Sequence, residues 1–589
     1  MPNPAPKTLC ESFQSLVAAH PDRVAIRTPG DTTVLTWRDY GERVERIAAG
    51  LAGLGVGRGH TVGIMLTNCP EFHLVDTAAL HAGATPFSIY NTNPPEKIQY
   101  LFGNAGNRVV VCETQFLDAV KTAARAGDIE HIVCVDGEHE SVLSLAELEN
   151  SPAPGYDFAA SWRAVDAGDV LTIVYTSGTT GPPKGVEITH ANLIANVDAA
   201  QEVMDVDIED RVVSYLPDAH AANRWVCHWG NLLAGVQITT VANPKEVLAA
   251  LTDVRPTLFM GVPVIWYKVK AGVEAKLAAE KSPLKKRLGA WAIGVGQRVA
   301  RLGGKPVPLP LRIRHRIAER LVLSRIRAAL GLDAVNVAAS SAAPIEPEAH
   351  EFMLALGIGV CEAWGMTELT AVATVNRPGK IRVGTVGTPL DGVEVRVAED
   401  GELLVRGPIV MKGYRGDPEK TAETVDAEGW VHTGDIGAID EDGYVRILDR
   451  KKELIINAAG KNMSPSNIEN AVKVGCPLIG SVLAVGDRRP YVVALVTLDP
   501  DACAAHAAEH GLPDASPAAL AADPEVVAMV EDAVGRANGK LARVEQVKKT
   551  AILPDVWEPG GDEVTPTMKL RRKPIATRYA DRIEDLYSA

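Results

Sequence analysis

The sequence predicts an α/β protein with a large N-terminal domain of doubly wound sheets plus a β-rich subdomain, and a small, mobile α+β C-terminal domain. Three observations support this fold class. Apolar runs of strand length alternate with segments of helical spacing over roughly the first 260 residues. Between about residues 383 and 445, apolar and polar side chains instead alternate with a period of two, which is typical of β-strands. Finally, a charged run near position 450 precedes a segment with strands of its own.

Helices and strands are expected to alternate from the amino end. Residues 40–54 and 70–83 carry apolar side chains at helical spacing, which predicts two amphipathic helices. Residues 61–66, 108–112 and 131–135 are short apolar runs, typical of strands buried on both faces. Strands and helices in this alternation predict a parallel sheet covered by helices.

A β-rich region is expected from about residue 383 to 445. Residues 393–397 and 401–407 alternate apolar and polar side chains on either side of the turn Glu399-Asp400-Gly401. Two such runs joined by a glycine-containing turn predict a β-hairpin.

The charged run at 448–452 is interpreted as a domain boundary. We therefore expect a large domain over 1–451 and a small domain over 452–589. The small domain has candidate strands at 481–485 and 491–498, followed by Ala-rich helices.

Composition limits the class and location of the protein. The chain has 589 residues and a formal charge of −14, and its eight cysteines form no C-x-x-C pair, so we expect neither a zinc site nor a disulfide framework. No secretory signal, prenylation box, peroxisomal address or apolar run of about 20 residues is present. We expect a cytoplasmic protein without a nucleic-acid partner; its oligomeric state stays open.

A basic insertion at about 268–330 contrasts with the net negative charge of the whole chain. Between Lys268 and Arg327 the chain has 16 Lys and Arg against 3 Asp and Glu. Its apolar side chains are interpreted as one helical face bordered by arginines (Ile313, Ile317, Leu321, Leu323, Ile326 and Leu330; Arg312, Arg316, Arg320 and Arg327). Such a helix fits peripheral contact with the inner face of a membrane. A helix docked on its own domain fits equally well.

The strongest local motif is a strand followed by a loop of hydroxyls, glycines and one lysine, Ile173-Val-Tyr-Thr-Ser-Gly-Thr-Thr-Gly-Pro-Pro-Lys-Gly185. Backbone N–H groups, hydroxyls and a cation in such a loop suit phosphate oxygens. It is not a Walker A loop, because Pro183 precedes Lys184 and Gly185 follows it. A mobile surface turn is the alternative.

This loop resembles the phosphate-binding signature of the AMP-forming adenylating enzymes, which include acyl-CoA synthetases, luciferases and peptide-synthetase adenylation domains. The resemblance continues from about Ala25 to about Lys573. It implies contacts to ATP phosphates throughout the loop, with Thr176 also serving catalysis and Mg²⁺ (Thr176, Ser177, Gly178, Thr179, Thr180, Gly181 and Lys184).

The second matching motif is Ala363-Trp364-Gly365-Met366-Thr367-Glu368. The resemblance implies that it lines the nucleotide: Trp364 stacks on adenine, Thr367 contacts phosphate and Glu368 binds Mg²⁺. An aromatic face and a carboxylate suit these roles. The family more often has Tyr than Trp here. Upstream, Ser341 and Ala342 match the segment that borders adenine, although an ordinary tight turn fits them too.

The remaining nucleotide motifs lie near the proposed boundary and the carboxyl end. The resemblance implies that Asp435 and Arg450 bind the ribose, that Lys452 is the domain hinge and that Lys569 is the mobile catalytic lysine. Taken alone, charged runs are usually solvated faces. Thr567-Met568 stands where Ser-Gly is common ahead of the lysine, a variant of the long-chain acyl-CoA synthetases.

The segment from Tyr215 to Trp225 resembles the family's Leu-Pro-x-x-His motif on the wall of the acyl pocket. The resemblance implies that His220 positions the substrate carboxylate and that Trp225 lines the tunnel or its gate. Asp218 and Asn223 depart from the family pattern. A His that is merely hydrogen-bonded is the structural alternative.

The resemblance implies a long-chain fatty acid–CoA ligase. Mg·ATP and the fatty acid would form an acyl-adenylate and pyrophosphate, and coenzyme A would then displace AMP. Three alternatives stay open: a ligase for medium-chain or aryl acids, an acyl-AMP ligase that loads a carrier protein, and a nucleotide-binding protein without catalysis.

Overall fold

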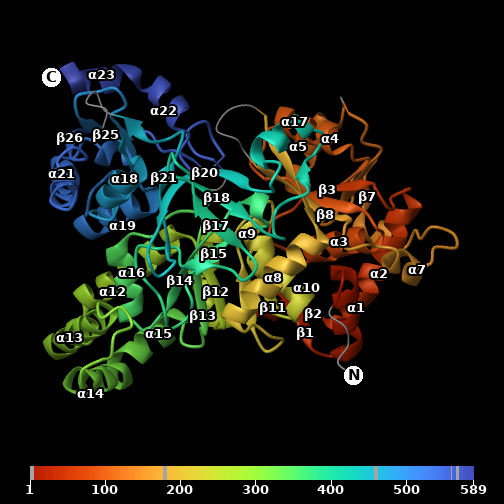
Figure 1. Ribbon diagram of the computed structural model, residues 1–589, viewed down its shortest axis with the longest axis horizontal. Helices are drawn as coiled ribbons and strands as arrows, with labels where there is room; N and C mark the ends of the chain where they lie inside the picture. Colours follow the sequence, from red (N-terminus) through yellow and green to blue (C-terminus); the bar gives the residue numbers. More distant parts are fainter. Residues whose placement is uncertain are drawn as a thin grey trace.

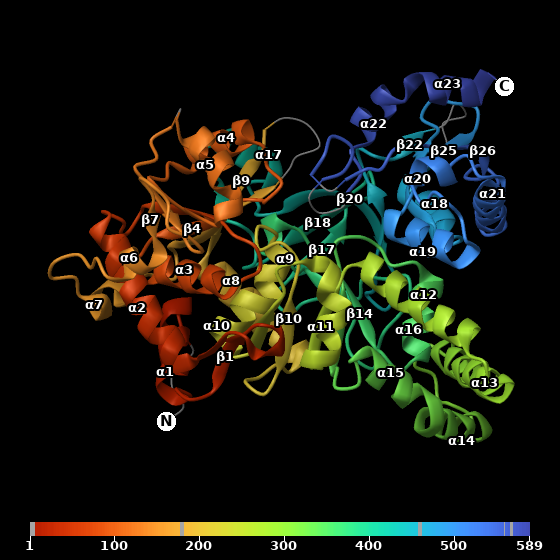
Figure 2. The same ribbon diagram turned by 180° about the vertical axis from the view of Figure 1, so that it is seen from behind.

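The computed structural model describes residues 6–125, 127–176, 182–456, 462–558, 560–565 and 569–588. It confirms the predicted α/β class, with parallel sheets in the N-terminal part and β-rich layers at its centre (Figure 1). The C-terminal segment packs above the insertion helices as a separate body with its own hydrophobic cores (Figure 2).

The N-terminal part contains two sheets, and the first of them includes all three predicted strands. The first is parallel throughout, in the order β4 (Thr85–Ser88), β3 (Thr61–Met65), β5 (Val109–Cys112), β6 (His131–Cys134) and β7 (Leu143–Ser144). The predicted helices are α2 (Trp37–Gly53) and α3 (Pro70–His81). The second sheet orders β10 (Arg211–Ser214), β11 (Gln237–Thr240), β1 (Val24–Arg27) and β2 (Val34–Thr36), of which only β2 is antiparallel.

Two further sheets form the centre of the molecule. Parallel strands β12 (Leu258–Gly261), β13 (Val337–Ser340) and β14 (Val360–Trp364) continue into antiparallel β15 (Thr374–Val375) and β16 (Thr388–Pro389). The predicted hairpin is confirmed as β17 (Glu394–Val397) and β18 (Glu402–Arg406), extended by antiparallel β20 (Val431–Ile439) and β21 (Val445–Arg450).

The phosphate-loop region contains one more strand than the single strand and loop predicted from its sequence. A second strand, β9 (Lys184–Thr189), intervenes between the loop and α8 (His190–Met204). It pairs antiparallel with β8 (Val170–Thr176) on one side and with β19 (Gly413–Tyr414) on the other. The β-branched residues of β9 were not recognised as a strand, because the helix-start signal at Thr189, which caps α8, follows them directly.

Beyond Arg450 lie the hairpin β22 (Ile455–Ile456) and β23 (Asn462–Met463), and a sheet of β24 (Ile479–Val485), β25 (Val492–Leu498) and β26 (Val547–Ile552). Helices α18 (Pro465–Lys473) and α21 (Pro524–Asn538) pack with it, which confirms an α+β texture. No helix in the described ranges is long and apolar enough to cross a membrane.

The prediction that the apolar side chains of the basic insertion share one helical face is wrong. The insertion folds as α12 (Pro263–Ala279), α13 (Pro283–Ala300), α14 (Leu309–Ala318), a π-turn η5 (Glu319–Leu323) and α15 (Ser324–Leu330). The π-turn accommodates an extra residue, which rotates the two halves relative to each other. Ile313, Ile317 and Leu321 are exposed, whereas Leu323, Ile326 and Leu330 pack on the core.

Buried histidines make the fold sensitive to acid. Burial lowers the pKa of His81 to about 4, and Phe158 stacks on its ring. An unfolded histidine has a pKa near 6.5. Between about pH 6.5 and 4 the unfolded chain therefore binds a proton that the folded chain does not, so the free energy of unfolding is full above pH 6.5 and decreases below it.

His81→Phe should reduce this acid-induced loss of unfolding free energy by about 3 kcal/mol, as measured by urea unfolding between pH 6.5 and 4. His510→Gln, at an exposed site, is the control; an unchanged pH profile for His81→Phe would refute the assignment.

Candidate active site

Parallel strands bring the predicted adenine-binding residues to one edge of a sheet. Ser341 and Ala342 directly follow β13, and Trp364 ends the neighbouring strand β14, with Ser340 and Glu362 in register. The chain turns sharply at both places. Ala342 has φ +75°, and a Cβ on Gly365 would lie 2.1 Å from the carbonyl oxygen of Ala371. The glycine is therefore required for the return of the chain behind Trp364.

A hairpin aligns Thr176 with Lys184, which are paired across β8 and β9. The predicted phosphate-binding residues Ser177, Gly178, Thr179, Thr180 and Gly181 lie outside the described residues. Nζ of Lys184 lies 4.7 Å from the ring centre of Tyr414, whose hydroxyl donates to Glu368 Oε1 at 2.7 Å. Burial lowers the pKa of Lys184, and the nearby Glu368 carboxylate partly offsets this. Lys184, Tyr414 and Glu368 thus form one cluster.

The pairing of β20 with β21 also brings Asp435 next to Arg450. Asp435 on β20 is the direct partner of Arg450 on β21, and Arg450 Nε lies 2.7 Å from Asp435 Oδ1. The other carboxylate oxygen, Oδ2, accepts a hydrogen bond from Trp364 Nε1 at 2.8 Å. The Trp that replaces the usual Tyr is therefore held by the predicted ribose-binding carboxylate, and three predicted residues converge.

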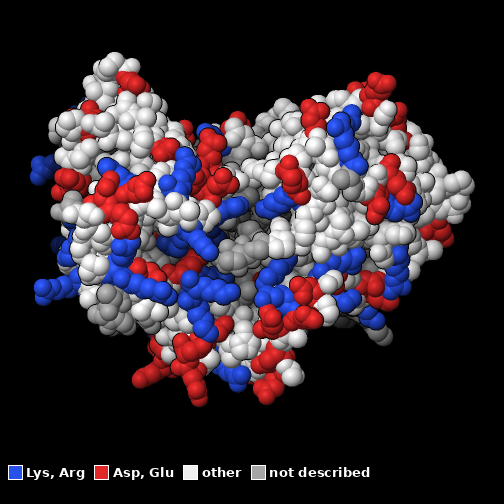
Figure 3. Space-filling model, turned by 90° about the horizontal axis from the view of Figure 1, so that it is seen from above, with Lys and Arg blue, Asp and Glu red and all other residues white. Residues whose placement is uncertain are grey.

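Lys569 reaches this cluster from the C-terminal segment. Its backbone N–H donates to Thr565 Oγ1 at 3.0 Å, and residues 566–568, including Thr567-Met568, lie outside the described residues. Surrounding protein and the Arg450 charge lower the pKa of Lys569, while Asp435 and Glu368 act in the opposite direction. The side chain nevertheless contacts solvent. Figure 3 shows a hollow on the upper face, bordered by Lys and Arg side chains.

The acyl-pocket motif follows β10 and is held by polar contacts. His220 caps the short helix α9 (Ala221–Asn223), and its Nδ1 accepts from the Ala222 N–H at 3.2 Å. Burial, with a contribution from the Lys569 charge, lowers the pKa of His220 to about 4. The ring is therefore neutral at pH 7, and its remaining proton is on Nε2, which can donate to a carboxylate.

Two departures from the family pattern compensate each other. Asn223 Nδ2 donates to Asp218 Oδ1 at 2.7 Å, and both side chains are buried. Burial raises the pKa of Asp218 to about 7.

Trp225 is fixed by a 2.7 Å hydrogen bond from Nε1 to Asn196 Oδ1, and it lies on the π-turn η3 (Arg224–Trp229).

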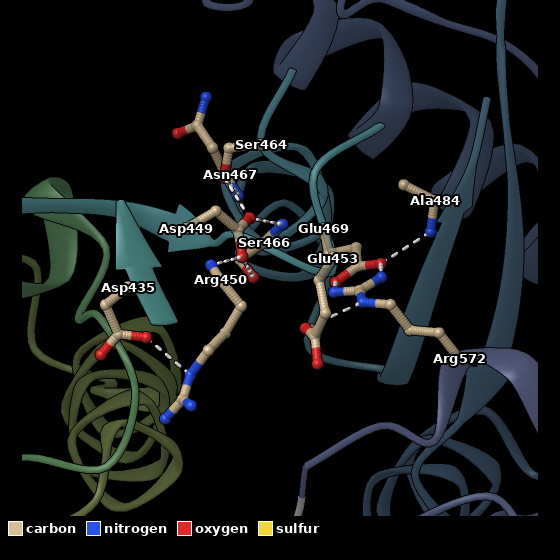
Figure 4. Close-up of polar contacts among 10 residues, drawn as sticks. All are labelled: Asp435, Asp449, Arg450, Glu453, Ser464, Ser466, Asn467, Glu469, Ala484 and Arg572. Carbon is tan, nitrogen blue, oxygen red and sulfur yellow. Dashed lines mark hydrogen bonds and ion pairs between the residues drawn. The ribbon is translucent and has the colours of Figure 1, made fainter. Parts of the chain in front are cut away.

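The proposed hinge is surrounded by a polar network (Figure 4). Asp449 Oδ2 accepts from Ser464 Oγ at 2.6 Å and from the Ser466 N–H at 3.1 Å, which ties β21 to the first turn of α18. Arg572 Nε lies 3.2 Å from Glu453, and its Nη2 lies 2.8 Å from Glu469. Lys452 is exposed between these contacts.

The sequence reasoning missed the roles of Tyr414 and Asp449. Tyr414 joins Lys184 to Glu368, and Asp449 joins β21 to the residue that caps α18. Their signal was position alone: a Gly-Tyr pair ahead of Asp435 and an acidic residue beside Arg450.

An aromatic ring at the carboxyl edge of parallel strands, with cations and carboxylates gathered beside it, is typical of a nucleotide-binding α/β enzyme. Residues 13–415 match the AMP-binding enzyme family, and residues 452–589 match the AMP-binding enzyme C-terminal domain. The chain belongs to the AMP-binding enzyme family.

Curated relatives span most of the chain. "Putative fatty-acid–CoA ligase fadD11" of Mycobacterium tuberculosis is 51% identical over 450 residues, covering 76% of this chain and 79% of that protein. Long-chain-fatty-acid–CoA ligase FadD15 of the same organism is 32% identical over 601 residues, covering 99% of each chain. Long-chain-fatty-acid–CoA ligase ACSBG2 of Gallus gallus is also 32% identical, covering 100% of this chain and 82% of that protein.

Solved structures share the fold. The adenylation domain of a carboxylate reductase from Mycobacterium chelonae superposes with a TM-score of 0.77 at 20% identity, covering 100% of this chain and 92% of that one. Anthranilate CoA ligase AuaEII, in complex with anthranoyl-AMP, gives a TM-score of 0.73 at 17% identity, covering 97% of each chain. The two-part fold of adenylating enzymes is thereby confirmed.

Proposed function

We propose that the protein is a long-chain fatty acid–CoA ligase that acts through an acyl-adenylate. The observation that carries the proposal is the convergence of Lys184, Glu368, Asp435, Arg450 and Lys569, whose charges interact with one another in one cluster. Relatives at 51% and 32% identity bear the names of fatty-acid–CoA ligases, and long-chain acids are named only at 32%.

The reaction needs activation because a free carboxylate has no good leaving group. Its oxygen attacks the α-phosphorus of ATP, and the bond from this phosphorus to the bridging oxygen breaks to release pyrophosphate. The thiolate of coenzyme A then attacks the acyl carbon, and AMP leaves with the C–O electron pair. The thiol proton passes to solvent. Lys569 offsets the negative charge that develops in the first step.

Each cluster has a role in this scheme. The terminal phosphates are held by Thr176, Lys184 and the loop between them, and Thr367 also contacts phosphate. Adenine is bordered by two segments, Trp364 to Met366 and Ser341 with Ala342. The ribose is bound by Asp435 and Arg450. The short Asp435–Arg450 contact supports the last assignment, because it fixes a carboxylate that can still accept from hydroxyls.

The donor set fits Mg²⁺ that arrives with ATP. Magnesium in such sites uses one or two carboxylates plus phosphate oxygens and water. Glu368 supplies one carboxylate, and the Thr176 hydroxyl supplies a second oxygen. Among the described residues no cluster of three His, Cys, Asp or Glu side chains offers an all-protein cage. When bound, Mg²⁺ would neutralise charge on the phosphates.

The acyl pocket and the hinge complete the proposal. Neutral His220 donates from Nε2 to the fatty-acid carboxylate, and Trp225 lines the acyl tunnel. We divide the chain at 451/452, with Lys452 as the hinge about which the small domain turns after adenylation. Moving Lys569 away from Asp435 and Glu368 would open a path for the thiol. Peripheral membrane contact by residues 268–330 is part of the proposal, and a cytoplasmic location stays a prediction.

A competition among acids tests the substrate class. Thioester formation is measured with a long-chain, a medium-chain and an aromatic acid at equal concentration, with coenzyme A as acceptor. The proposal predicts the highest kcat/KM for the long-chain acid. Preference for either other acid would overturn the long-chain assignment, and adenylation without thioester formation would favour the carrier-loading alternative.

Asp435→Asn should raise the KM for ATP by roughly 10- to 100-fold, because hydrogen bonds to a charged group contribute about 1.5–3 kcal/mol. A contact made equally in the ground and transition states changes KM more than kcat. Asp442→Asn is a matched control, since Asp442 is exposed and pairs with Arg382 at 2.7 Å. An unchanged KM in Asp435→Asn would contradict the ribose assignment.

A further inference from the structure

Helix α14 carries two apolar faces, and only one of them packs on the protein. Leu311 contacts the core, and Ala318 is fully buried in it. The other face is a stripe of large apolar side chains at four-residue spacing, continued through the π-turn: Leu309, Ile313, Ile317 and Leu321. These are 58%, 52%, 46% and 43% exposed. The stripe is about 18 Å long at 1.5 Å per residue.

Unpaired arginines border this stripe. Arg312, Arg316 and Arg320 each precede one of its members, and Arg314 lies between them. All four are exposed, and no carboxylate in the described part of the chain pairs with them. The neighbouring Arg327 shows the contrast, because it is paired with Glu319. Charges left free around an apolar stripe are not explained by the packing of the helix.

The position of α14 suits docking on a flat surface. Figures 1 and 2 place α13 and α14 at the outer edge of the molecule, away from strands β20 and β21, which carry Asp435 and Arg450. The segment from Lys268 to Arg327 has a net charge of +13 within a chain of −14, so the positive charge is concentrated at this edge. A second copy would present the same basic face in a two-fold interface, and the like charges would repel.

We propose that the outward stripe of α14 docks on an anionic phospholipid bilayer, with Leu309, Ile313, Ile317 and Leu321 entering the interface and the arginines contacting lipid phosphates. This combination is the one that interfacial amphipathic helices use. The inference rests on the proposed function for its purpose, since a bilayer concentrates long-chain acids close to the enzyme. Binding itself requires no substrate.

Co-sedimentation of the full chain with vesicles tests the docking. The vesicles are phosphatidylcholine alone, or phosphatidylcholine with an equal share of phosphatidylglycerol. We expect binding to the anionic vesicles only, weakening as salt is raised. Arg312→Gln with Arg316→Gln should weaken it roughly 30-fold, since each basic residue near an anionic surface contributes about fivefold. Ile313→Gln with Ile317→Gln should weaken it at least roughly tenfold.

Matched controls separate the stripe from general charge and apolarity. Arg543→Gln with Arg582→Gln removes the same charge from the C-terminal segment, and Val397→Gln removes an apolar side chain that is 41% exposed. Both should bind like the parent. No binding to anionic vesicles, equal losses in test and control variants, or a dimer that the Ile313→Gln, Ile317→Gln variant dissociates would each overturn the proposal.

Activity keeps the two proposals distinguishable. Pyrophosphate release with a water-soluble medium-chain acid, in the absence of vesicles, should be unchanged in the stripe variants. Loss of vesicle binding with retained activity therefore concerns only the docking surface. An inactive parent that still binds anionic vesicles would contradict the proposed function and leave the docking intact.

Discussion

Replacing Lys569 by Ala should slow acyl-adenylate formation by roughly 10²- to 10³-fold, as measured by pyrophosphate release from Mg·ATP and a fatty acid. In the structure the carboxylates of Asp435 and Glu368 act on the pKa of this lysine, and the lysine charge contributes to the lowered pKa of His220. Its ammonium group would therefore face the α-phosphate during the first half-reaction. The hydrogen bond from Lys569 to Thr565 uses the backbone N–H, which the substitution retains.

The second half-reaction separates catalysis from folding damage. Thioester formation from supplied acyl-adenylate and coenzyme A should proceed at nearly the parent rate in Lys569→Ala, because the proposed mechanism uses Lys569 only in adenylation. Lys573→Ala removes an exposed lysine four residues away and should leave both half-reactions unchanged. Equal loss of both half-reactions in Lys569→Ala would contradict the division of roles.

Asp76→Ala should lower the free energy of unfolding by about 3–5 kcal/mol, because it leaves the Arg224 guanidinium buried without its carboxylate. Both side chains are almost completely inaccessible, and Arg224 also donates to Thr172 Oγ1 at 2.6 Å. Burial alone would raise the pKa of Asp76, but the charge of Arg224 and contacts with His228 lower it overall. The cluster anchors the π-turn that carries Trp225.

A double substitution tests whether the cost comes from the unpaired charge. Asp76→Leu with Arg224→Met should recover most of the loss seen with Asp76→Ala, since removing both members of a buried pair leaves no stranded charge. Asp22→Ala breaks the exposed pair with Arg38 and should leave the urea midpoint unchanged. A double variant as unstable as Asp76→Ala would indicate a packing defect.

The sequence predicted elements whose signals are local. The helix at Trp37–Gly53 and the strands at Thr61–Met65 and Val109–Cys112 follow directly from periodicity and β-branched composition. Strand β9 was missed, because its six residues lie between a stronger loop motif and a stronger helix cap. The insertion face was wrong because spacing assumes a regular helix, and the π-turn at Glu319–Leu323 changes the register.

Site residues were predictable from motifs, but their contacts were not. Asp435 and Arg450 were named separately, and only strand pairing shows that they form one ion pair. The Tyr414–Glu368 hydrogen bond joins residues 46 positions apart, and the Arg224–Asp76 pair joins residues 148 apart. Asp218 and Asn223 each looked like a departure from the family, and their mutual hydrogen bond explains both.

The most direct test of the central claim is pyrophosphate release from Mg·ATP and a long-chain fatty acid, measured with and without coenzyme A and with the products identified. The account predicts release that coenzyme A accelerates, together with AMP and the acyl-CoA thioester in equal amounts. Release that ignores coenzyme A and yields no thioester would contradict it, and so would the absence of release with every acid tried.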